Sequence, residues 1–171
     1  MSALWADARL RVYGMVLGSR VAGLPDRLAQ ADSLDYHCLV AGALSPAQRL
    51  RAPYLVELRP DSSFTRWLLL EAAAGFADWG LVVRSTARML DVRSHARDLR
   101  TAVTPEGRAF RVDWMDPVVL DVLLTSATPD QLQAIFARLD AMTVIAPQRW
   151  REYRLESGRL QLRSVDVLKA G

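Results

Sequence analysis

The sequence predicts one domain of the mixed α/β (α+β) class, spanning residues 1–171, with a mostly antiparallel sheet of about five to seven strands flanked by helices. In the N-terminal part, short apolar runs typical of strands alternate with segments of helical periodicity. In the C-terminal part, glycine-containing turns join strand-like runs directly. A chain of 171 residues, 51% of them hydrophobic, is long enough to bury one substantial core.

The N-terminal part contains four expected strands, which are runs rich in β-branched or aromatic residues between turn residues. They cover residues 10–17, 36–40, 53–58 and 79–83. Three helices are expected between and after them, at residues 24–31, 62–74 and 86–99. Pro25 is suited to open the first helix, and Gly75 to stop the second. In the third helix, apolar residues three and four positions apart predict one buried stripe.

The C-terminal part contains two hairpin signals and two helix starts. Strands at residues 100–104 and 108–112 flank a turn in which Gly107 can supply the positive φ of a three-residue loop. One helix begins after Asp116, and another begins after Thr128 with a capping box. Residues 141–171 are expected to form a hairpin-like tail, with strands at 150–155 and 159–165.

Composition limits the compartment and the class of partner. No run of about 18 apolar residues predicts a membrane-spanning helix, and the first residues carry charges where a signal peptide needs an apolar core. With Cys38 as the single cysteine, we expect a soluble, cytoplasmic protein. The net charge is +3, and 21 of the 22 basic residues are arginine. This bias fits either a GC-rich genome or a surface built for partner contacts.

Asp113 and Asp116, three positions apart, are the first candidates for a catalytic or metal site. Asp116 precedes Pro117, and this pair is typical of a helix N-cap followed by the first helical residue. Asp113 lies at the end of the preceding strand, so the two carboxylates need not converge. No His, Cys or Glu nearby completes a metal set. The sequence therefore favours a structural role for Asp116.

Other candidates for chemistry are weaker. His37 and Cys38 are adjacent on an expected strand, so their side chains point to opposite faces. His95 has no acid or cysteine at ligand spacing, and Gly14 and Gly18 lack the lysine of a phosphate-binding loop. We expect no catalytic residue, cofactor or metal site, although a small cytoplasmic enzyme whose groups meet only on folding stays open.

An arginine-rich helix suggests a contact surface. Arg93, Arg97 and Arg100 fall at i, i+4 and i+7, which predicts one shared face opposite the apolar stripe. This face is either solvated or a binding site for an acidic protein partner. A basic nucleic-acid-binding module is the poorer interpretation, because Asp91 and Asp98 interrupt the positive field.

Four segments in order resemble a known family. They are VYGMVLGSR, APYLVEL, WGLVVRS and TPEGRAFRVDWMDPVVLDVLL. Together they are similar to the adaptor-chaperones of type VI secretion systems, often called the Tap or TEC family and long catalogued as a domain of unknown function. The similarity covers about residues 10–140. The family's hairpin-to-helix passage is matched here by Gly107, Arg111, Asp116 and Pro117, among others. The chain departs from the family pattern at Leu17, Ala41, Ala96 and Met115.

The resemblance implies a non-enzymatic adaptor that binds a secreted effector protein and promotes its loading onto the trimeric spike protein VgrG. It implies no cofactor, and neither nucleic acid nor a membrane as a partner. Because the chain ends soon after the shared part, we expect a minimal adaptor without a further lobe. The site residues expected to contact a partner are Arg93, Arg97 and Arg100, and those expected to shape the chain are Gly107, Arg111, Asp116 and Pro117.

Overall fold

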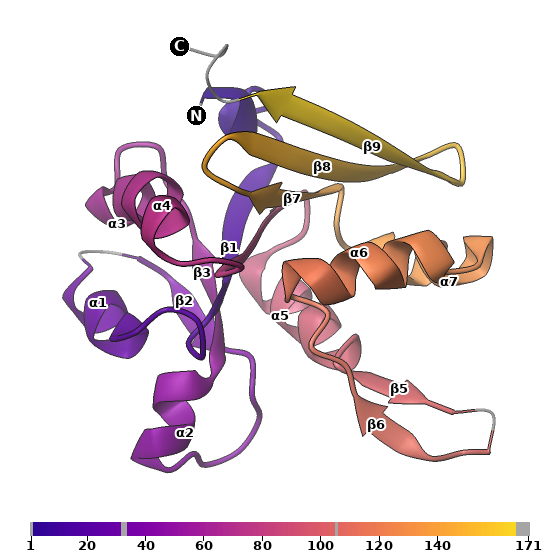
Figure 1. Ribbon diagram of the computed structural model, residues 1–171, viewed down its shortest axis with the longest axis horizontal. Coiled ribbons are helices and arrows are strands. Elements are labelled where there is room, and N and C mark those ends of the chain that lie inside the picture. The colour runs from indigo at the N-terminus through magenta and orange to yellow at the C-terminus, as the bar shows by residue number, and fades with distance from the viewer. Residues whose placement is uncertain (1, 32–33, 105, 167–171) are drawn as a thin grey trace.

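The computed structural model describes residues 2–31, 34–104 and 106–166, and it has a mixed fold of helices and antiparallel sheets (Figure 1). Seven strands form one sheet in the order β2-β3-β1-β4-β7-β8-β9, and β5 and β6 form a separate hairpin. Every ladder between the described strands is antiparallel. The predicted fold class, with a mostly antiparallel sheet flanked by helices, is confirmed.

The strands are short at the edge formed by β2 and long in the C-terminal hairpin. They are β1 (Arg11–Leu17), β2 (Tyr36–Cys38), β3 (Pro53–Glu57), β4 (Gly80–Ser85), β5 (Thr101–Val103), β6 (Ala109–Arg111), β7 (Ala141–Ile145), β8 (Arg149–Glu156) and β9 (Arg159–Asp166). The predicted turn at Gly107 is present, because its φ is 81° and its N–H donates to the Thr104 carbonyl. The predicted tail hairpin is the pair β8–β9.

The helices include several short turns. They are η1 (Ser2–Trp5), α1 (Leu24–Gln30), α2 (Pro46–Arg51), α3 (Ser63–Arg66), η2 (Trp67–Ala72), α4 (Ala73–Gly75), α5 (Met89–Asp98), α6 (Pro117–Ser126) and α7 (Pro129–Phe136). The elements α3, η2 and α4 follow one another without a break, with a π-helical segment in the middle, and they end at Gly75 as predicted. Among the described helices, none combines the length and apolar character that crossing a bilayer requires.

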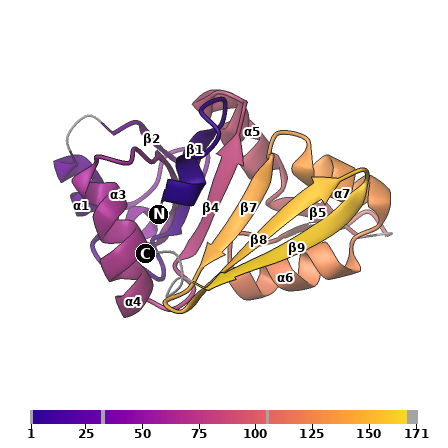
Figure 2. The ribbon, with the colours of Figure 1, turned by 90° about the horizontal axis from the view of Figure 1, so that it is seen from above.

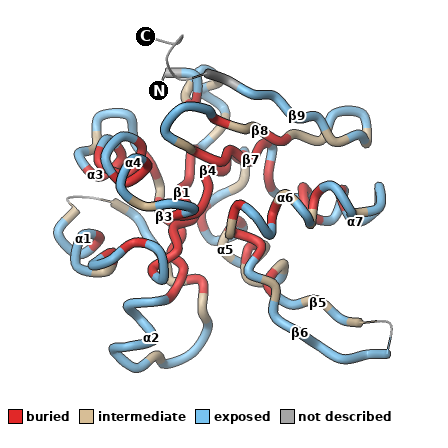
Figure 3. The backbone as a smooth tube through the Cα atoms, in the orientation of Figure 1, coloured by how far each residue is buried: buried red, intermediate tan, exposed pale blue. Residues whose placement is uncertain are grey.

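Two hydrophobic clusters lie on opposite faces of the sheet. In β1, Tyr13 and Met15 belong to the cluster covered by α5, α6 and α7, whereas Val12 and Val16 belong to the cluster covered by α1 and the α3–α4 segment (Figure 2). This alternation follows from the two-residue period of a strand. Burial is concentrated in the central strands β1, β3, β4 and β7 (Figure 3). The central strands are therefore buried on both faces.

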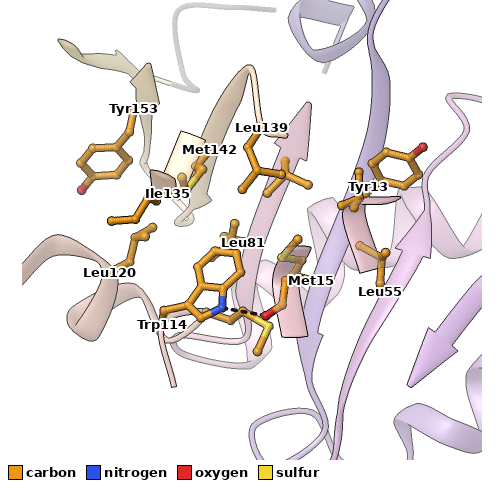
Figure 4. Packing of buried hydrophobic residues seen from close by; sticks show 14 of the residues in the cluster. Tyr13, Met15, Leu55, Leu81, Trp114, Leu120, Ile135, Leu139, Met142 and Tyr153 are labelled. Carbon is orange, nitrogen blue, oxygen red and sulfur yellow. Dashed lines mark hydrogen bonds between the residues drawn. The ribbon is translucent and has the colours of Figure 1, made fainter. Parts of the chain in front are cut away.

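The first cluster contains the side chains that anchor the helices to the sheet. Leu81, Leu120 and Met142 are fully buried within it, and Trp114 lies between α6 and the sheet (Figure 4). The Nε1–H of Trp114 donates to the Ala96 carbonyl at 3.2 Å. A buried indole that has both apolar contacts and a hydrogen-bond partner fixes the position of the chain on either side of it. Trp114 thus sets the position of the turn that precedes α6.

Candidate partner-binding surface

The turn that contains Asp113 and Asp116 is anchored to the core. The Asp116 N–H donates to the Asp113 carbonyl at 2.9 Å, and the two intervening side chains, Trp114 and Met115, are fully buried. With the middle of the turn held inside, the carboxylates at its two ends lie toward the surface. The turn therefore presents two acidic groups at one place.

Asp116 caps α6, as predicted. Its side chain accepts a hydrogen bond from the Val118 N–H at 2.9 Å, and Pro117 occupies the first turn of the helix. It also accepts a hydrogen bond from a terminal nitrogen of Arg20 at 3.0 Å. The Arg20 contact joins residues 96 positions apart, which local sequence patterns could not indicate.

Asp113 is paired with two arginines. Its Oδ1 accepts from Arg111 Nε at 3.3 Å and from an Arg100 terminal nitrogen at 3.4 Å. The sequence did not require Asp113 and Asp116 to converge, and the structure places both in the lining of one hollow of the surface. They lie there among arginines, and among the described residues no group of three or more His, Cys, Asp or Glu side chains is placed to hold a metal ion.

This hollow, the basic cleft, has a volume of about 450 Å³. Three arginines from distant segments line it: Arg20 follows β1, Arg51 ends α2, and Arg111 ends β6. The rest of its lining is Leu17, Ser19, Pro53, Asp113 and Asp116. Among the described residues, Arg51 has no ion-pair or hydrogen-bond partner for its guanidinium. The basic cleft thus holds one arginine whose charge no described residue neutralises.

A second hollow, the apolar hollow, adjoins the basic cleft through Arg111, which lines both. Its volume is about 330 Å³. The lining is Leu39, Val40, Ala41, Arg97, Arg100, Thr101, Ala109, Phe110 and Arg111. Phe110 is 49% exposed, although an aromatic ring of this size is normally largely buried. The two hollows place an accessible aromatic side chain beside a group of arginines.

The arginines expected to share a solvent-exposed face are arranged differently. Arg100 lies beyond the last residue of α5 and is only 6% exposed, and Arg93 and Arg97 are half-buried. The prediction of one exposed face opposite the apolar stripe is therefore wrong for Arg100. The expected contacts of Arg93, Arg97 and Arg100 with a partner protein stay a prediction.

Arg97 and Arg100 bind the chain that follows the edge strand β2. Arg97 donates to the carbonyls of Cys38 at 2.8 Å and Val40 at 3.3 Å, and Arg100 donates to the carbonyl of Leu39 at 3.2 Å. Unpaired carbonyls at a sheet edge are a template for unwanted strand addition. These two arginines occupy such carbonyls, so they hold β2 and α5 together.

The histidines and the cysteine make ordinary structural contacts. His37 Nε2 lies 3.5 Å from Asp35, His95 Nε2 lies 2.8 Å from the Ile135 carbonyl, and Cys38 Sγ accepts from the Val40 N–H. His37 pairs with Leu55 and Cys38 with Tyr54 in the ladder of β2 and β3. Their side chains lie on opposite faces of the sheet, as predicted for adjacent strand residues.

A further apolar surface lies on α6. Val118 and Val122 are 62% and 64% exposed, and Val119 is 36% exposed. A surface helix normally directs its apolar residues to the core and polar residues to solvent, whereas α6 has apolar residues on both sides. The sequence segment VVLDVLL contained this signal, because its apolar residues exceed what one buried stripe requires.

Comparison with known proteins identifies one family. The family model described as a domain of unknown function, DUF4123, matches residues 15–134, which is more than half of the chain. Neither a curated protein nor a solved structure matches the chain in the same comparisons. The matched range includes the turn with Asp113 and Asp116 and all the arginines of the two hollows. The chain therefore belongs to the DUF4123 domain family.

Proposed function

We propose that this protein is a non-enzymatic adaptor-chaperone that binds a cognate effector of a type VI secretion system and promotes its loading onto the VgrG spike protein. The DUF4123 match over residues 15–134 carries this proposal. It includes part of the first and all of the other three segments that resemble the type VI adaptor-chaperones.

The surface of the protein supports a role in binding another protein. Exposed apolar side chains lie on several elements, and they are grouped on α6, with Val118, Val119 and Val122, and on the hairpin β5–β6, with Val103 and Phe110. Exposed apolar groups beside polar ones are typical of protein interaction sites. A chaperone gains affinity by covering apolar surface of its client, so such side chains suit the proposed function.

Co-expression with candidate clients tests the proposal directly. The chain should be produced together with the products of the reading frames that neighbour its gene, each carrying an affinity tag. A ligand that binds the folded or loading-competent client stabilises it by mass action. We expect one neighbouring product to gain soluble yield and to co-purify with the chain, together with the spike protein.

Deletion of the gene provides the test in the cell. An adaptor selects cargo and does not power the secretion machine, so export of one effector should stop while other effectors still leave. Complementation with the wild-type gene is the control. Loss of all secretion, unchanged secretion, or failure to co-purify with any neighbouring product would contradict the proposed function.

A further inference from the structure

We propose that the basic cleft and the apolar hollow form one groove that binds a short segment of the client, with acidic side chains in the cleft and an apolar side chain in the hollow. The proposal rests on the proposed function, since it names the chemistry of the client segment. Arg111 lines both parts, so one continuous segment can contact both.

The charge of the groove favours an acidic segment. Five arginines line its two parts, namely Arg20, Arg51, Arg97, Arg100 and Arg111, and the acidic residues there are Asp113 and Asp116. Five arginines against two aspartates leave the lining with an excess of three positive charges. A local excess of positive charge steers acidic partners toward the groove.

Three of these arginines are placed to receive carboxylates. Arg51 has no partner among the described residues, and the side chains of Arg20 and Arg111 are 50% and 58% exposed. Arg111 contacts Asp113 through Nε, so its terminal nitrogens are not used in that bond. A guanidinium binds a carboxylate through two parallel hydrogen bonds, which gives the contact a defined geometry. The cleft can thus hold an Asp or Glu side chain in a fixed orientation.

The hollow supplies the apolar part of the contact. Phe110 is half-exposed beside Val40, Ala41 and Ala109, so an apolar client side chain placed there would remove Phe110 from water. Desolvated aromatic residues near the centre of an interface contribute much of the binding energy. The hollow therefore sets affinity, while the arginines set charge specificity.

The groove fits a protein segment better than nucleic acid. A single client carboxylate needs only one guanidinium, such as that of Arg51, whereas a phosphate backbone is held by a continuous run of positive charge. In the basic cleft that run is interrupted by Asp113 and Asp116. Their carboxylates instead orient Arg111 and Arg20 through hydrogen bonds at 3.3 and 3.0 Å. Binding of DNA at this groove is an outcome that the experiment can reveal.

The first test compares groove variants with matched controls in binding the co-purified client. Arg51→Glu reverses the unpaired charge, and Phe110→Ser removes the apolar ring. Arg66→Glu makes the same charge change on an exposed residue of α3, and Leu70→Ser replaces a residue that is 48% exposed, close to the 49% of Phe110. Neither control residue lines the groove. Circular dichroism and thermal unfolding establish that each variant folds.

We expect each groove variant to weaken binding about tenfold or more in calorimetry, and the controls to bind within about twofold of wild type. A client that binds the wild-type chain and binds the groove variants equally well would overturn this inference while leaving the proposed function intact. Failure of the wild-type chain to bind any client would instead count against the proposed function.

A second test does not depend on the client. A random library of short displayed peptides is selected on the wild-type chain, with counter-selection on the Arg51→Glu and Phe110→Ser variants. We expect enriched peptides to place Asp or Glu next to Leu, Phe or another large apolar residue. No enrichment, enrichment without acidic residues, or binding of labelled DNA that requires Arg51 would each overturn the inference.

Discussion

At the scale of single residues, Asp113 and Asp116 show how similar side chains in one turn obtain different partners. Asp116 satisfies a backbone N–H of α6 and also contacts Arg20, whereas Asp113 contacts two arginines and no helix end. The N-cap was predictable because a cap depends on the next few residues only. The arginine partners of both residues depend on the fold and were not predictable from the motif.

Replacing Asp116 by Ala should lower the free energy of unfolding by about 0.5–2 kcal/mol, because the cap on the Val118 N–H is lost. Asp116→Asn retains a good capping side chain and removes the charge, so its stability should stay near that of wild type. Arg20→Ala removes only the partly exposed ion pair, which contributes at most about 1 kcal/mol. Urea unfolding measures all three. An Ala variant as stable as the Asn variant would contradict the capping role.

At the scale of elements, α5 is joined to the sheet edge by Arg97 in its last turn and by Arg100, which follows the helix. Removing Arg100 leaves the Leu39 carbonyl without its donor in a buried position, and Asp113 loses one of its two arginines. The Arg100→Met variant should therefore lose about 1–3 kcal/mol of unfolding free energy. Arg88→Met is the matched control, since Arg88 is exposed just before α5. Equal stability of these two variants, with client binding lost only in Arg100→Met, would make Arg100 a direct partner contact.

The helix α6 is joined to the sheet by a buried hydroxyl. The Tyr153 O–H donates to Asp121 Oδ1 at 2.7 Å, and burial together with this hydrogen bond raises the pKa of Tyr153 above its ordinary value of 10.0. When the pKa of a phenol is raised in the folded state, its full contribution to stability is present at a pH below its pKa in the unfolded chain. That stability is lost as the pH rises from about 10 toward the folded pKa.

Between about pH 9 and about pH 11, the wild-type protein should therefore lose unfolding free energy with rising pH. Burial also raises the pKa of Tyr13 and Tyr54, so these residues contribute in the same direction. Tyr153→Phe should reduce the slope above about pH 10 by up to ~1.4 kcal/mol per pH unit, which is the contribution of one proton. Urea unfolding across this range measures the slope. Identical slopes for wild type and variant would show that Tyr153 already ionises in the folded state.

Elements with a local signal were predictable, and those without one were not. The capping box of Thr128 and Gln131 predicted α7 correctly. The same signal is present at Ser45 and Gln48, where it begins α2, but that helix was not predicted. The strand β7 was also not predicted, because it is buried on both faces and lacks the polar alternation of a half-buried strand.

At the scale of the whole molecule, the fold class was predictable and the groove was not. The order of strand-like and helical segments limits the possible folds to a few. The groove instead combines residues that follow β1, end α2 and end β6. It can therefore be recognised only when the order of the strands in the sheet is known. The arginine bias of the sequence had a partner-binding surface as one of its two interpretations. The arginines named for that surface include Arg97 and Arg100, which line the groove, although Arg100 is only 6% exposed, and they do not include Arg20 and Arg51.

The proposed adaptor function also predicts how the amount of soluble client depends on the amount of chain added. A chaperone that works by binding protects only as many client molecules as it occupies, whereas an enzyme converts an excess of substrate. When a fixed amount of the aggregation-prone client is refolded with increasing amounts of the chain, soluble client should rise in proportion to the added chain and then level off. The intact mass of the client should stay constant throughout.

Serum albumin at equal mass is the control for crowding, which stabilises proteins only weakly. If trace amounts of the chain change the covalent mass of all the client, or solubilise it in large excess, the protein is an enzyme. If the Phe110→Ser variant moves the plateau of the titration to higher chain concentration without lowering its final height, the weakened groove still forms the same complex. Groove affinity and stoichiometry are then separate properties of the molecule, as expected if binding alone protects the client.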